Sequence, residues 1–97
     1  PEMSRGLGDV YKRKIQYRRL LSPVQWQLLI AIAKEERVFQ PQSKAFLAKY
    51  KIGTPANSKR ALEALLDKEM IFKEEDLRNS WYQVYDVFLS RWLQLTF

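Results

Sequence analysis

The sequence predicts a mainly α-helical domain with one small β-hairpin, an α+β fold in which a helix-turn-helix precedes the hairpin. Two helical segments, 43–50 and 55–68, flank a tight turn at 51–54 that contains Gly53, as in a helix-turn-helix. Aromatic and β-branched residues at 70–74 and 81–85 flank a polar turn, which is typical of a hairpin. With an apolar helix in front, this order is that of a winged helix-turn-helix domain. An extra N-terminal helix and a C-terminal helix are expected around it.

The strongest local signal lies at the start of the apolar helix. Ser22 is expected to cap this helix, Pro23 to take its first position and Gln25 to complete a capping box. The helix should continue to about residue 36, and six consecutive apolar residues at 28–33 leave it almost no solvated face. We therefore expect it to be the central buried helix. Val38 and Phe39 are compatible with a very short strand.

The chain divides into two predicted parts. Residues 1–20 are interpreted as an N-terminal tail and a basic linker helix at 9–20, and residues 21–97 as the winged-helix domain. Asp86 should cap a last helix that runs from Val87 to about residue 94, with Phe88, Leu89, Trp92 and Leu93 as its apolar stripe. Residues from three helices are predicted to form the core: Trp26, Leu29, Ile30, Leu62, Leu65, Leu66 and Trp92.

The composition removes several kinds of chemistry from this chain. It contains no Cys and no His, so thiol chemistry, disulfides, structural zinc and the usual general base have no residues to carry them. We expect no catalysis, no cofactor and no metal. No apolar run approaches the ~20 residues of a membrane-spanning helix, so no membrane partner is expected. The absence of Cys fits a cytoplasmic protein.

The charge is distributed unevenly along the chain. The net charge is +6, and residues 1–22 carry six basic residues against two acidic ones. Residues 38–60 carry five basic residues and no acidic residue, whereas residues 61–76 carry two basic and six acidic residues. The basic field therefore covers the predicted turn and the start of the second helix of the helix-turn-helix, and it reverses toward the far end of that helix.

This basic field supplies the candidate DNA contacts. A helix-turn-helix places the N-terminal residues of its second helix in the major groove, where Arg60 could reach a guanine edge and Asn57 an adenine edge. Lys side chains, the Ser58 hydroxyl and the amides at the helix start suit phosphates. The predicted DNA-binding set is Lys44, Lys49, Lys51, Thr54, Asn57, Ser58, Lys59 and Arg60. The competing interpretation is that Thr54 only caps the helix and that the charges only solvate the domain.

The stretch Tyr82-Gln83-Val84-Tyr85-Asp86-Val87-Phe88-Leu89-Ser90-Arg91-Trp92-Leu93 resembles the end of a bacterial and archaeal family of AAA+-type ATPases. In that family a P-loop ATPase domain is followed by a C-terminal winged helix that ends in aromatic-x-Val-x-Asp-Pro-Phe-Phe-x-x-Trp-Leu. Residues 21–25, 31–33, 46–50 and 61–68 are also similar, so the resemblance covers residues 21–93. Val87 stands where the family usually has Pro. The chain has no Gly-Lys-Ser or Gly-Lys-Thr and should not bind ATP itself.

The resemblance implies a non-catalytic accessory domain that contacts DNA and has the ATPase domain of its parent chain as a partner. The start at Pro1 rather than Met fits a fragment of a longer protein. A second function remains open, namely a protein-interaction module that docks on its ATPase domain, or forms a homodimer, through a patch that includes Trp81 or Tyr85. The acidic run Glu74-Glu75-Asp76 in the hairpin favours this alternative, and the acid-free stretch 38–60 favours DNA.

Overall fold

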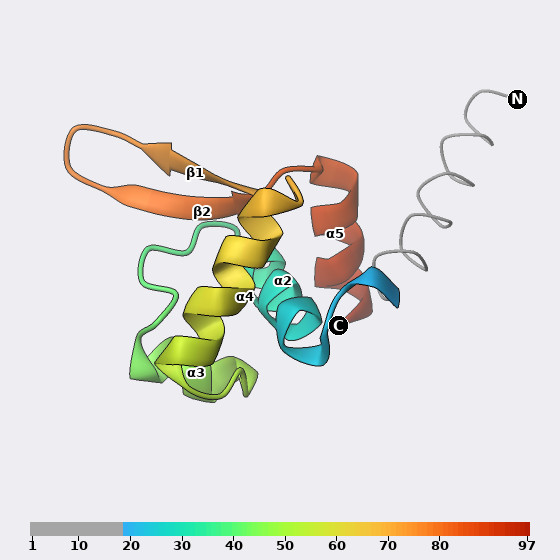
Figure 1. Ribbon diagram of the computed structural model, residues 1–97. Coiled ribbons are helices and arrows are strands. Elements are labelled where there is room, and N and C mark those ends of the chain that lie inside the picture. The colour runs from blue at the N-terminus through green and yellow to red at the C-terminus, as the bar shows by residue number, and fades with distance from the viewer. Residues whose placement is uncertain (1–18) are drawn as a thin grey trace, which may run out of the picture.

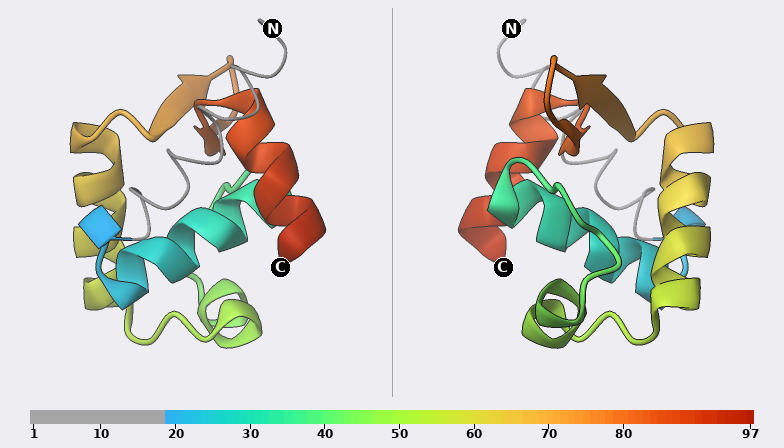
Figure 2. Two further views of the ribbon diagram at one scale, coloured as in Figure 1. Left: turned by 90° about the vertical axis from the view of Figure 1, so that its right-hand side faces the viewer. Right: turned by 90° about the vertical axis from the view of Figure 1, so that its left-hand side faces the viewer.

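The computed structural model describes residues 19–97, so the predicted helix at 9–20 lies outside the described residues except for its last two positions. The described elements are α2 (Pro23–Glu35), α3 (Lys44–Tyr50), α4 (Pro55–Asp67), β1 (Ile71–Glu75), β2 (Ser80–Val84) and α5 (Val87–Thr96). The β1–β2 hairpin projects from a body of helices (Figure 1). The left view of Figure 2 shows α2 running between α4 and α5. The fold class predicted from the sequence is confirmed for these elements.

Helix α2 is the central element of the body. The capping box predicted at its start is confirmed, because the Gln25 amide donates to Ser22 Oγ at 3.2 Å and the Ser22 amide donates to Gln25 Oε1 at 3.2 Å. The residues at 28–33 are all buried, as expected for a helix without a solvated face. Helix α2 contacts α3, α4, α5 and β2, so its apolar surface is used on every side.

The sheet is an antiparallel hairpin in which Ile71 pairs with Val84 and Glu75 pairs with Ser80. β1 begins and ends one residue later than predicted, because Met70 is buried as the chain leaves α4 and its amide donates to Leu65 at 3.0 Å. β2 begins and ends one residue earlier than predicted. The very short strand expected at 38–39 is reduced to a single bridge from Val38 to Tyr82, with N···O distances of 3.0 and 2.9 Å, and Phe39 is not part of it. The bridge ties the segment after α2 to the hairpin.

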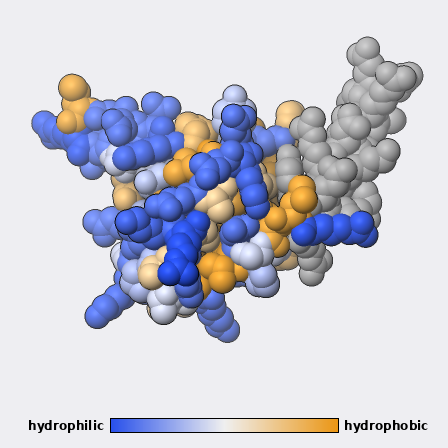
Figure 3. Space-filling model, viewed as in Figure 1, coloured by the Kyte–Doolittle hydropathy of each residue, from blue (hydrophilic) through white to orange (hydrophobic). Residues whose placement is uncertain are grey.

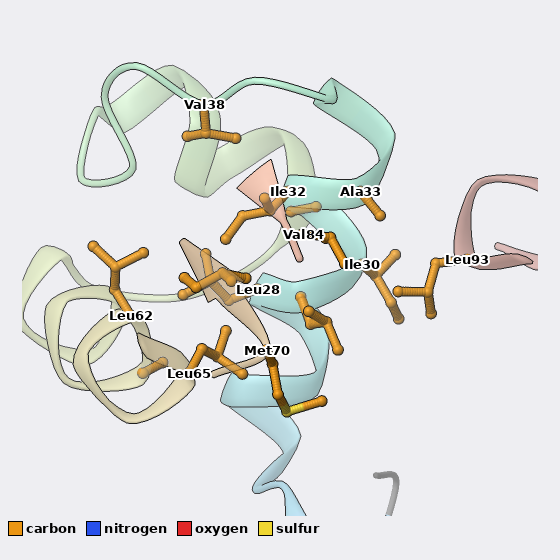
Figure 4. Packing of buried hydrophobic residues seen from close by; sticks show 14 of the residues in the cluster. Leu28, Ile30, Ile32, Ala33, Val38, Leu62, Leu65, Met70, Val84 and Leu93 are labelled. Atoms are coloured by element: carbon orange, nitrogen blue, oxygen red, sulfur yellow. The ribbon is translucent and has the colours of Figure 1, made fainter. Parts of the chain in front are cut away.

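The core joins α2, α4 and α5. Four of the seven predicted core residues, Leu29, Ile30, Leu62 and Leu65, are buried. Figure 4 shows Leu65 near Leu28, and Ile30 facing Leu93. The other three predicted core residues are half-buried and pack against this cluster: Trp26, Leu66 and Trp92. The two tryptophans meet the Phe97 ring edge-on, at centroid distances of 5.9 and 5.8 Å, at the edge of the core.

Helix α5 begins at the predicted cap and ends two residues later than predicted. Asp86 Oδ1 accepts from the amides of Phe88 and Leu89 at 2.9 and 3.3 Å. The prediction that Phe88 belongs to the buried stripe is wrong, because this side chain is 73% exposed. Successive residues of a helix are rotated by about 100°, so burying Leu89 and Leu93 against α2 turns Phe88 toward solvent.

Candidate nucleic-acid interface

The turn between α3 and α4 fixes how the two helices present their polar side chains. Lys51 ends α3 in the left-handed region at φ 54°, and the next amide, that of Ile52, donates to Leu47 at 3.0 Å. Ile52 is buried and anchors the turn in the core. Gly53 follows at φ 108°, a conformation that glycine adopts without the steric cost of a Cβ. The chain therefore reverses within four residues, as the sequence predicts.

Helix α4 begins as the sequence predicts. Thr54 is extended, at φ −85° and ψ 157°, and its hydroxyl accepts from the Asn57 amide at 3.2 Å. Pro55 takes the first helical position, where its missing N–H costs nothing. This cap holds the first turn of α4 in place at the surface of the molecule.

Seven of the eight predicted DNA-contacting residues are exposed on α3, the turn and the first half of α4. We give the name basic face to six of these exposed residues, leaving out the paired Lys49: Lys44, Lys51, Thr54, Asn57, Lys59 and Arg60. Figure 3 shows hydrophilic side chains projecting from the region of α3 and the start of α4, among residues of intermediate hydropathy. Asn57 and Arg60 are three residues apart, so they lie on the same side of the helix. Both line a shallow hollow of about 230 Å³ between α4 and the start of α2.

Lys49 is also exposed, but it is paired with an acidic residue from α2. Its Nζ lies 3.0 Å from Glu35 Oε1, and the Tyr50 hydroxyl donates to the same oxygen at 2.8 Å. The hydrogen bonds from Lys49 and Tyr50 lower the pKa of the Glu35 carboxyl, and the bond to Glu35 raises the pKa of Lys49. Part of the Lys49 charge is therefore already compensated within the protein.

The prediction that the Ser58 hydroxyl contacts phosphate is corrected by its position. Ser58 is fully buried, and its Oγ donates to the Pro41 carbonyl at 2.8 Å. The bond joins α4 to the segment before α3 and satisfies a carbonyl that would otherwise be buried without a partner. Ser58 is therefore a structural residue of the helix-turn-helix.

The hairpin turn is acidic and tightly hydrogen-bonded. Asp76 Oδ1 accepts from the amides of Arg78 and Asn79 at 2.8 and 2.7 Å, and these two bonds lower the pKa of the Asp76 carboxyl. Glu74 and Glu75 are exposed, and Glu75 lies 3.5 Å from Lys73. Within residues 19–97, no group of three or more acidic residues is arranged to hold a metal ion. Asp76 therefore stabilises the backbone of the turn, whereas Glu74 and Glu75 add exposed negative charge beside it.

Arg37 is a basic residue that the sequence analysis did not single out. Its guanidinium lies 4.9 Å from the centre of the Trp81 ring, and the Phe39 ring lies 5.8 Å from the same ring. Trp81 is 8% exposed because these neighbours cover it, so it is a packing residue rather than an open docking patch. Its Nε1 donates to Gln83 at 2.8 Å. Arg37 and Trp81 are distant in sequence, so no local pattern indicates their contact.

A helix-turn-helix followed by an antiparallel hairpin defines a winged-helix domain, and a small domain of this kind is usually non-catalytic. The chain belongs to the family described as "Probable winged helix domain", whose model matches residues 11–95. A search of curated proteins returned no significant match. The family match begins inside the segment predicted to be a linker, and the division at residues 20 and 21 stays a prediction. In the part of the chain that the structure describes, every helix is too short or too polar to traverse a bilayer.

Proposed function

We propose that this winged-helix domain is a DNA-binding module and that the basic face is its contact surface. The observation that carries the proposal is the exposure of Lys44, Lys51, Lys59 and Arg60 around the capped start of α4. Basic side chains neutralise phosphates and release condensed counterions, which gives most of the affinity of non-specific DNA binding. The first turn of α4 is the part that a helix-turn-helix presents to the major groove.

In the proposed complex the side chains of the basic face have two roles. Asn57 and Arg60 reach base edges, because an amide pairs with adenine and a guanidinium pairs with guanine. Lys44, Lys51 and Lys59 contact phosphates and set the position of the helix without reading sequence. Lys49 contributes less than these three, because Glu35 already holds its ammonium group at 3.0 Å.

The acidic residues of α4 and the hairpin limit how the domain can approach DNA. Glu63 and Asp67 are exposed along the second half of α4, and the hairpin turn carries Glu74, Glu75 and Asp76. Phosphates repel these carboxylates, so α4 enters the groove with its N-terminal end rather than along its length. The hairpin stays away from the duplex in this arrangement.

The proposal also includes the larger protein to which the domain belongs. The resemblance of residues 21–93 to the C-terminal winged helix of AAA+-type ATPases supports an accessory role beside an ATPase domain in the same parent chain. The domain itself would then supply only binding, and the ATPase domain would control when the basic face is presented to DNA.

The experiment is a fluorescence-anisotropy titration of a labelled duplex with two charge-matched variants of the 97-residue chain. Lys59→Glu with Arg60→Glu reverses two charges on the basic face, and Lys73→Glu with Arg78→Glu reverses two charges on the hairpin. All four side chains are exposed, so both variants should fold. We expect the first variant to lose binding by orders of magnitude and the second to lose much less. Equal losses would show that net charge, and not the basic face, drives binding.

A second function, protein interaction without DNA, is favoured by a different observation. Tyr85, Val87 and Phe88 are 68%, 63% and 73% exposed. They lie close together at the start of α5, where they line the same hollow as Glu69 and Asp86. Clustered exposed apolar side chains are typical of contact surfaces. Under this alternative the wild-type chain does not bind DNA at low salt, and analytical ultracentrifugation detects a dimer or a complex with the parent ATPase domain instead.

A further inference from the structure

An apolar hollow lies where the end of α4, the start of β1 and the start of α5 meet. Its volume is about 400 Å³, and its walls include Met70, Tyr85, Val87 and Phe88. Phe72 adds to this apolar surface, because its ring lies 5.9 Å from the Tyr85 ring in an edge-to-face arrangement. Large apolar side chains that are exposed together around a hollow indicate a surface that another segment covers.

The rim of the hollow is acidic. Glu69 and Asp86 both line it, and none of the described residues around it is basic. An apolar surface with negative charges at its edge is complementary to a segment that carries apolar and basic side chains together. The charge of the rim therefore restricts the chemistry of the occupant.

Residues 9–18 of this chain have that chemistry. Val10, Tyr11 and Ile15 recur at helical spacing, and four basic residues lie among them, namely Lys12, Arg13, Lys14 and Arg18. Ten residues of helix are about 15 Å long, which is enough to cross a small hollow. The family match begins at residue 11, so most of this segment belongs to the matched region.

The point where this segment joins the described domain lies close to the hollow. Lys68 Nζ donates to the Leu20 carbonyl at 3.1 Å and to Gln25 Oε1 at 3.3 Å. Lys68 immediately precedes Glu69, which lines the hollow. Leu20 is therefore separated from Glu69, at the rim of the hollow, by about the length of one lysine side chain and one residue. Residues 9–18 need no long connection to reach the hollow.

We propose that residues 9–18 bind this apolar hollow in the same molecule, with their apolar side chains in the hollow and their basic side chains facing Glu69 and Asp86. The docked segment fixes the direction from which the preceding polypeptide enters the winged-helix domain. It also places basic residues of the N-terminal segment at the acidic end of α4, away from the basic face. This inference does not depend on DNA binding.

Paramagnetic relaxation in the 97-residue chain tests the proposal. The chain has no Cys, so Gln16→Cys provides a single attachment site for a nitroxide label. We expect the label to broaden the amide signals of residues 69–70 and 85–89, and we expect Phe88→Ser to abolish this broadening. Leu95→Ser is the matched control, because Leu95 is 89% exposed on the same helix but does not line the hollow. The control should keep the broadening.

The charge pattern gives a second pair of variants. Glu69→Lys should reduce the broadening, whereas Glu63→Lys, which makes the same charge change at an exposed position of α4 outside the hollow, should not. Broadening that is absent from residues 69–70 and 85–89, or that survives Phe88→Ser, overturns the proposal. Broadening that arises only between labelled and isotope-enriched molecules in a mixture also overturns it, because the occupant is then a second copy.

Discussion

The two ends of α4 differ in charge, in apolar exposure and in what they can bind. At its start, the basic face carries exposed Lys, Arg and Asn side chains around the Thr54 cap. At its end, Glu69 and Asp86 surround a hollow lined by exposed Tyr85 and Phe88. The first surface is complementary to a polyanion, and the second is complementary to an apolar, basic segment. One helix therefore separates two surfaces with opposite preferences.

The same core supports both surfaces. Leu62 and Leu65 lie between the two ends of α4 and pack on α2, while Met70 carries the chain from α4 into the hairpin. The difference between the surfaces is thus one of side chains and not of separate folding units. It follows that variants in the core should affect both surfaces together, whereas surface variants should affect one at a time.

The largest effect is expected from a substitution in the shared core, because it should disrupt both surfaces together. Leu65 is completely buried, and Leu65→Ala should lower the free energy of unfolding by ~2–5 kcal/mol through lost transfer energy and a residual cavity. Leu66→Ala, at a half-buried neighbour, should cost clearly less. Urea denaturation measures both values. A Leu65→Ala loss well under ~1 kcal/mol would contradict the packing described for α4.

A smaller effect is expected for Ser58, and it distinguishes this structural residue from the residues that we propose bind DNA. Ser58→Ala removes the donor to the Pro41 carbonyl and should destabilise the domain by ~1–3 kcal/mol, because a buried carbonyl loses its partner. At a temperature where the variant is folded, its DNA affinity should equal that of the wild type. A selective loss of affinity with unchanged stability would instead return Ser58 to the contact surface.

The sequence predicts the local features of the fold because they depend on neighbouring residues. Ser22, Thr54 and Asp86 each cap a helix within three residues of their own position, and all three caps are present. The buried side of α4 is larger than the predicted leucine stripe, because it also includes Ser58. Ser58 precedes Leu62 by four residues and Leu65 by seven, so its helical spacing already places it on the buried side. Helical spacing is therefore the signal that indicates a buried Ser58.

The rest of the candidate site depends on contacts between distant segments. The stretch 38–60 has no acid of its own, but α2 brings Glu35 to Lys49 from 14 residues away. The contact between Arg37 and Trp81 likewise spans more than 40 residues. The packing of α3 on α4 decides how the side chains of the basic face lie relative to one another. The periodicity within each helix cannot predict that packing.

The smallest expected effect concerns Glu35, which compensates part of the Lys49 charge. Its folded pKa lies below the ordinary value of 4.5, so its contribution to stability is present above pH 4.5 and is lost as the pH falls through the folded pKa. Glu35→Gln should remove this acid-side dependence from a pH series of thermal melts. It should also release Lys49 and strengthen DNA binding slightly at neutral pH. Weaker binding by Glu35→Gln would show that the pair positions Lys49 for contact.

The salt dependence of DNA affinity tests most directly whether the basic face meets the phosphate backbone. In the proposed complex four exposed cations displace condensed counterions, namely Lys44, Lys51 and Lys59 at phosphates and Arg60 in the groove. Each neutralised phosphate contributes about −0.9 to the slope of log affinity against log salt concentration, so the wild-type slope should be roughly −3 to −4. Lys59→Glu with Arg60→Glu should flatten this slope. No binding at low salt and tens of micromolar protein, or a wild-type slope near zero, would contradict the account.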